Sequence, residues 1–199
     1  MAQAPIQFDR ASGALEGANL WERTAALALV TGSKISSHFS HMGYIACANL
    51  LRKTLPERNI AIKLNPDAVF EFPYGDGYWS KLLNRSYNYE DELELLFADS
   101  IDVDYTLLDC GANYGYWSVL VSSKPFGSHK AIAIEPSGQN YPKLANNARV
   151  NGNRFETMKC AIGASRGTAG CRAPSTKPSA SPAIRRPAVR TCRSSRSTI

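Results

Sequence analysis

The sequence predicts an α/β fold whose second half is a parallel sheet with crossover helices. Three observations predict it. First, residues 105–110, 130–136 and 155–163 have the short apolar pattern of strands, whereas 116–123 and 141–150 have helical patterns. Second, a turn with glycines four residues apart follows the first strand, and third, an acidic residue ends the second. A βαβαβ order implies parallel pairing, and therefore half of a doubly wound sheet.

The N-terminal half has a different pattern. Residues 1–18 are polar and rich in Gly and Ala, which predicts a loose segment. Two helices are expected at 20–30 and 42–55. In the first, Leu20, Leu27 and Val30 share one helical face, and the second ends before Pro56.

A hairpin is predicted next, because apolar residues alternate at 60–64 and an extended pattern resumes at 69–72 after an Asn-Pro-Asp turn. The aromatic loop at 74–79 (YGDGYW) fits packing onto the next domain better than a substrate lip. A helix is expected at 89–101. These predictions divide the chain into an N-terminal helical extension (1–55), a hairpin with a lead-in helix (56–104), the half-sheet (105–166) and a tail (167–199).

Charge is distributed unevenly along the 199 residues. The formal net charge is +6, but nine of the 23 basic residues follow Glu156, which is the last acidic residue. The chain up to Glu156 therefore carries 14 basic and 17 acidic residues. The tail is almost entirely Ala, Pro, Ser, Thr and Arg, a composition that predicts disorder. It suits either an arginine-rich nucleic-acid binder or, as we prefer, an out-of-frame reading of the end of a gene.

Targeting and metal signals are weak. The five cysteines are scattered without zinc-ligand spacing, which favours a reducing compartment. The N-terminus lacks a signal-peptide pattern, and the longest apolar run is far shorter than the roughly 20 residues that span a bilayer. We therefore expect a cytoplasmic protein without a membrane span. His38 and His41 are three residues apart without a third ligand, so no metal site is predicted.

The turn after the first strand has the form Asp109-x-Gly111-x-Asn113-x-Gly115. A dinucleotide fingerprint has glycine in the middle position, and Asn113 therefore disfavours a pyrophosphate. Glycines instead let the backbone approach an amino-acid moiety, near the acceptor and donor groups of Asp109 and Asn113. Glu135 follows Gly115 by 20 residues, where an acid accepts hydrogen bonds from ribose hydroxyls. Ribose joined to an amino acid without pyrophosphate describes S-adenosylmethionine. The alternative is a tight turn beside a solvated acidic strand end.

The segments GDGYWSKLL, YNYEDELELLF, LLDCGANYGYWSVLV, AIAIEPSGQNYPKLANNARVNG and AIGASRG resemble successive blocks of the FkbM-type family of S-adenosylmethionine-dependent methyltransferases. The resemblance covers about residues 70–167. It implies a Rossmann-like class I methyltransferase fold and O-methylation of a sugar, glycolipid or secondary metabolite. It also implies a set of cofactor-binding residues: Asp109, Gly111, Ala112, Asn113 and Gly115 around the methionine part, Glu135 at the ribose, Pro136 beside it, and Ala161 and Ile162 near adenine.

The chain departs from that family in one respect that affects function. The class I sheet has seven strands, whereas residues 105–166 suffice for three, so the expected fold is an incomplete half and no catalytic residue is assigned. An isolated half-sheet leaves an edge and part of its faces uncovered, which predicts marginal stability or self-association. The expected function is methyl transfer from S-adenosylmethionine to a small-molecule or glycan acceptor. The alternatives are a non-catalytic cofactor-binding remnant and a nucleic-acid binder acting through the arginine-rich tail.

Overall fold

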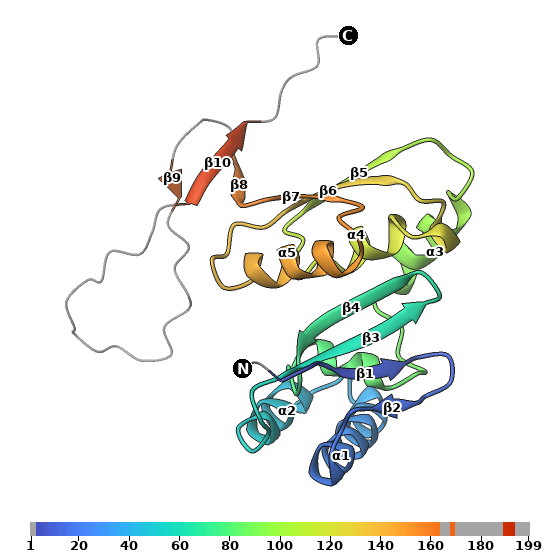
Figure 1. Cartoon of the computed structure of the whole chain (residues 1–199), viewed down its shortest axis with the longest axis vertical. Helices are drawn as coiled ribbons and strands as arrows, with labels where there is room; N and C mark the ends of the chain where they lie inside the picture. The colour runs from blue at the N-terminus through green and yellow to red at the C-terminus, as the bar shows by residue number, and fades with distance from the viewer. Residues whose placement is uncertain (1–2, 164–167, 170–188, 194–199) are drawn as a thin grey trace, which may run out of the picture.

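The computed structural model describes residues 3–163, 168–169 and 189–193, and these form three sheets (Figure 1). The strand orders are β2-β1-β3-β4, β5-β6-β7 and β8-β10-β9. The predicted mixed α/β class with a parallel sheet is confirmed. The strands are β1 (Ile6–Asp9), β2 (Leu15–Glu16), β3 (Asn59–Asn65), β4 (Ala68–Pro73), β5 (Thr106–Cys110), β6 (Lys130–Ile134), β7 (Glu156–Met158), β8 (Cys160–Gly163), β9 (Thr168–Ala169) and β10 (Val189–Arg193).

Five α-helices and two short 3-10 helices connect these strands within the described residues. The α-helices are α1 (Leu20–Ser37), α2 (Tyr44–Arg52), α3 (Asp91–Asp99), α4 (Tyr116–Val121) and α5 (Tyr141–Val150). The 3-10 helices are η1 (Trp79–Leu83) and η2 (Lys124–Phe126).

The first sheet joins the N-terminus to the predicted hairpin. β3 and β4 pair antiparallel with Ile62 opposite Phe70, as the alternation predicted, and β1 pairs parallel with β3 with Ile6 opposite Ile60. The prediction of a loose segment at 1–18 is therefore wrong for β1 and β2. Ile6 is fully buried, because a strand with alternating apolar residues contributes to the core once a parallel partner is present. The boundary expected at residue 55 thus does not separate two structural units.

Helix α1 begins where the sequence predicts, but a different face of it is buried. Asn19 caps the helix: its side chain accepts from the Glu22 N–H, and Glu22 accepts from the Asn19 N–H. The predicted apolar stripe is exposed at Leu20 and Leu27, whereas the small residues around Leu29 form the buried face. In Figure 1, α1 and α2 lie on the far side of the first sheet from α4 and α5.

The second sheet has the predicted parallel βαβαβ connection. β5 pairs with β6, and β6 with β7, both in parallel register. Helices α4 and α5 lie between this sheet and β4, and they contribute the fully buried Val119 and Leu144 to a core shared with the first sheet (Figure 1). The two sheets are therefore joined through one apolar interior.

The predicted third strand is divided between two sheets. β7 completes the parallel sheet, but β8 pairs parallel with β10, with Cys160 opposite Arg190. Residues 168–169 and 189–193 are strands within the segment expected to be disordered, so that expectation is wrong for them. The rest of the predicted tail lies outside the described residues.

Three further expectations concern membranes, metals and cysteines. In the described parts of the chain, no helix has the length and apolar character needed to cross a bilayer. No group of three or more potential metal ligands occurs among the same residues. His38 Nδ1 instead donates to the Lys34 carbonyl, and His41 Nδ1 is hydrogen-bonded to the Ser36 hydroxyl. Cys160 forms a disulfide, a bond that the scattered cysteines do not predict.

Candidate cofactor-binding site

The turn from β5 to α4 is held in shape by alternating left-handed residues. Gly111, Asn113 and Gly115 have φ values of 80°, 54° and 85°. A left-handed conformation is strained for most residues but accessible to glycine and tolerated by asparagine, which explains these residue types at these positions. The N–H groups of Gly111 and Ala112 both donate to the Ile134 carbonyl, at 2.8 and 3.0 Å. The turn is therefore fixed against the end of β6.

Glu135 connects this turn to the one that follows β6. Its Oε2 accepts from the Asn113 N–H at 2.9 Å, and its Oε1 accepts from the Ser137 N–H at 2.8 Å. The side chain is buried, with 5% of the residue exposed. A carboxylate has about four acceptor positions, so each oxygen retains acceptor capacity beyond these two bonds. Glu135 is therefore not the solvated acidic residue that the alternative interpretation assumed.

Asp109 lies on the side of β5 that faces α4. Its Oδ2 accepts from the Ser118 hydroxyl at 2.7 Å. Burial raises the pKa of this carboxyl group, an effect that the hydrogen bond from Ser118 opposes and the charges of Glu90 and Glu135 reinforce. Asp109 therefore links the end of β5 to α4 through Ser118, and its carboxyl group is partly shielded from water.

The two glycines of the turn have different surroundings. A Cβ added to Gly115 would lie 2.5 Å from Cδ1 of Leu144, so this glycine is required for the close packing of α4 on α5. A Cβ added to Gly111 would meet nothing within 4 Å. The backbone at Gly111 consequently borders open space, which is the property expected of a glycine that a ligand approaches.

Asn113 provides a second indication at the same place. Its side-chain Oδ1 is buried and has no hydrogen-bond partner. Buried polar atoms are nearly always paired, and an exception calls for an explanation such as a ligand or a solvent molecule. This acceptor fits an amino-acid moiety, because the ammonium group of such a ligand would donate to it.

The structure brings seven of the nine predicted residues together at one edge of the parallel sheet. These residues lie at the carboxyl ends of β5 and β6, which are adjacent parallel strands: Asp109 is near the end of β5, and the others follow β5 or β6, namely Gly111, Ala112, Asn113, Gly115, Glu135 and Pro136. Ala161 and Ile162 lie on β8, which belongs to another sheet, and Ile162 is exposed. Ala161 and Ile162 are therefore not in the sheet that carries the glycine turn, and their position beside adenine stays a prediction.

Sequence reasoning missed the contact between the turn and the aromatic loop. The Tyr114 hydroxyl donates to Oδ2 of Asp76 at 3.4 Å, while Oδ1 of Asp76 accepts from the N–H groups of Tyr78 and Trp79. Trp79 is buried and stacks on Tyr116 with ring centroids 5.7 Å apart. The loop is therefore mainly a packing element, as its aromatic composition predicted. Its Asp76 also holds the side chain of Tyr114, a residue of the glycine turn.

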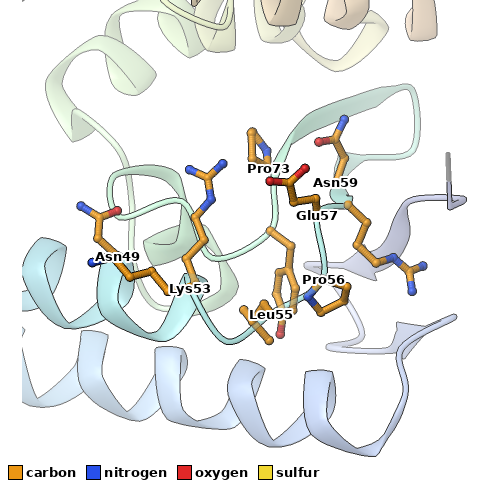
Figure 2. A pocket seen from close by; sticks show the side chains of 10 residues that line it. Asn49, Lys53, Leu55, Pro56, Glu57, Asn59 and Pro73 are labelled. Carbon is orange, nitrogen blue, oxygen red and sulfur yellow. The ribbon is translucent and has the colours of Figure 1, made fainter.

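A cavity of about 680 Å³ opens elsewhere, at the end of α2 (Figure 2). In Figure 2, Asn49 of α2 and Lys53, which caps this helix, lie on one side of the cavity, and Pro73, Glu57 and Asn59 lie on the other. Its lining is polar and includes three basic side chains, those of Arg52, Lys53 and Arg58. None of the nine predicted residues lines it, so this cavity and the glycine turn are separate features.

Comparison of the chain with protein-family models, with curated proteins and with solved structures gives no match in any of the three.

Proposed function

We propose that the turn at 109–115 and Glu135 bind S-adenosylmethionine, and that the chain is a methyltransferase resembling the FkbM type. The observation that carries the proposal is the position of Glu135, a buried carboxylate that bonds to the glycine turn at the ends of two adjacent parallel strands. Ligands of open α/β sheets bind beyond the carboxyl ends of the strands, which is where this group lies.

Each residue of the turn has a distinct part in the proposed site. Gly111 leaves room for the amino-acid moiety, and Asn113 Oδ1 accepts from its ammonium group. The remaining acceptor positions of Glu135 take the ribose hydroxyls. When bound, the cofactor supplies an activated methyl group. The protein accelerates such a transfer mainly by positioning the acceptor, and no described residue is assigned as its base.

The test compares two glycines. Gly111 and Gly152 both have positive φ values, 80° and 71°, and a Cβ on either meets nothing within 4 Å. Gly152 follows α5, at the opposite end of the sheet from the glycine turn. We expect Gly111→Ala to weaken binding of S-adenosylmethionine at least tenfold in isothermal titration, because the new methyl group fills the ligand's space, while Gly152→Ala binds like the wild type. Equal affinities for the two variants, or a wild type that does not bind, would refute the proposal.

A second candidate is a cofactor-binding protein that transfers no methyl group. It is favoured by the switch of β8 out of the parallel sheet, which leaves three strands in that sheet among the described residues. A transfer assay with radiolabelled S-adenosylmethionine and cell-extract glycans separates the two. Labelled glycan supports the methyltransferase, and tight binding without label supports the second candidate.

A further inference from the structure

Large apolar side chains are exposed on α1, on α2 and on the segment between them. On α1, Leu20 and Leu27 are 82% and 67% exposed, and Ile35, near the end of the helix, is also exposed. Phe39 and Met42 are exposed between the helices. Leu50 on α2 is 67% exposed. α1 and α2 pack against each other, so these exposed apolar side chains lie on adjacent elements, and apolar surface gathered in this way favours an interaction site.

The charges on the same surface have one sign. Arg23, Lys34, Arg52 and Lys53 are exposed basic residues between Leu20 and Leu55. The single carboxylate of that segment, Glu22, is fully buried and pairs with Nη1 of Arg58 at 3.2 Å. Arg23 follows Leu20 by three residues and lies beside the exposed stripe of α1, and Lys34 follows Leu27 by seven residues and continues the line of that stripe.

We propose that this surface, called here the α1–α2 face, docks on an anionic lipid bilayer. Leu, Phe and Trp combined with Lys and Arg are the composition of helices that lie in a membrane interface. Trp21 is half-exposed beside the stripe, where its indole N–H donates to the Thr54 carbonyl. α1 has 18 residues and thus extends for about 27 Å along its axis, enough to lie along a bilayer surface.

Charge also distinguishes the bilayer from other occupants. A second copy of the chain would bring this surface against the same surface, and its exposed charges, those of Arg23, Lys34, Arg52 and Lys53, would then meet only charges of the same sign. Protein interfaces are in addition depleted of Lys, whereas acidic lipid headgroups attract every basic residue close to the surface.

The experiment titrates the full chain with vesicles of phosphatidylcholine alone and with vesicles containing phosphatidylserine. Binding is followed by co-sedimentation and by tryptophan emission. Trp79 and Trp117 are buried, so a blue shift on binding reports Trp21. We expect binding to the anionic vesicles that weakens with salt.

The variants assign that binding to the α1–α2 face. Leu27→Gln with Leu50→Gln should reduce affinity about tenfold or more, because two apolar anchors are lost. Arg23→Gln with Lys34→Gln should reduce it about fivefold per charge. Leu95→Gln is the matched control, since Leu95 is 65% exposed on α3, and it should bind like the wild type.

All of these variants keep the nine basic residues after Glu156. Undiminished vesicle binding in both double variants would overturn the proposal and assign binding to those residues. A wild type that does not bind vesicles but forms a dimer disrupted by Leu27→Gln would overturn it in favour of self-association. Circular dichroism of each variant establishes that the fold is retained.

Discussion

Asp109 shows how one partly buried carboxyl group affects stability. Its position at the end of β5 was predictable from the sequence, because the apolar run ends there. Its orientation towards Ser118 and its burial were not, since they depend on the packing of α4 against the strand. The raised pKa of Asp109 means that the folded chain holds its proton more strongly than the unfolded chain does.

The stabilising contribution of protonated Asp109 is complete below the pKa of the unfolded chain, 3.8, and is lost as the pH rises through the higher pKa of the folded state. Asp109→Asn keeps an acceptor for Ser118 and removes the titration. We expect the free energy of unfolding of this variant, relative to the wild type, to increase from about pH 4 towards neutrality.

Urea unfolding at a series of pH values measures this difference. Asp99→Asn is the control, because Asp99 is exposed at the end of α3. A pH-independent difference between Asp109→Asn and the wild type would contradict the assigned burial effect.

At the scale of elements, α5 is attached to β4 by two buried asparagines one turn apart. Asn147 accepts from the Glu71 N–H at 2.7 Å and donates to the carbonyls of Glu71 and Tyr114, both at 2.9 Å. Asn151 accepts from the Val69 N–H at 2.9 Å and donates to the Val69 carbonyl at 2.6 Å. The side-chain amides thus bond to β4 as a neighbouring strand would, and Asn147 also anchors the glycine turn.

Asn147→Ala should therefore be strongly destabilising. It leaves the Glu71 N–H and the carbonyls of Glu71 and Tyr114 without partners. Each such group costs about 1–3 kcal/mol when buried, and because the two groups of Glu71 are only partly buried we expect a loss in the lower part of the summed range, roughly 3–5 kcal/mol. Chemical denaturation measures the change. Asn146→Ala is the control: Asn146 accepts only from Arg149 on an exposed surface, so a loss of at most about 0.5 kcal/mol is expected. Similar losses in the two variants would argue against the buried amide contacts.

The sequence pattern of α1 predicted where the helix begins but not which of its faces is buried. The stripe of Leu20 and Leu27 has the same periodicity as a buried stripe, and nothing local distinguishes the two. The buried face of α1 consists mainly of small residues around Leu29, and the helix packs against η1 and α2. The role of Asn147 was equally hidden, because asparagine in a helix usually indicates a surface position or a cap.

At the scale of the whole molecule, local pairing was predictable and distant pairing was not. The hairpin β3–β4 and the βαβαβ connection follow from short-range pattern and turn residues. The parallel pairing of β1 with β3 joins segments about 50 residues apart, which no local signal specifies. The grouping of the turn with Glu135 was predictable because parallel strands end at a common edge. The exclusion of Ala161 and Ile162 from that sheet was not.

The parallel sheet leads to a prediction about association. Leu108 and Met158 on its strands are exposed, and an exposed apolar sheet surface favours contact between molecules. We expect the wild type to self-associate as its concentration rises, and Leu108→Lys to shift the chain to monomer in analytical ultracentrifugation. Leu95→Lys, which alters a comparably exposed residue on α3, should leave association unchanged. Monomeric wild type at all concentrations would disprove the prediction.

The asparagines of α5 have a consequence beyond stability. β4 is the outermost strand of its sheet, and such strands ordinarily recruit strands from other molecules into growing fibrils. The amides of Asn147 and Asn151 already occupy the backbone groups of Glu71 and Val69 that an incoming strand would need. As long as α5 is folded, this side of the protein is closed to amyloid-like growth.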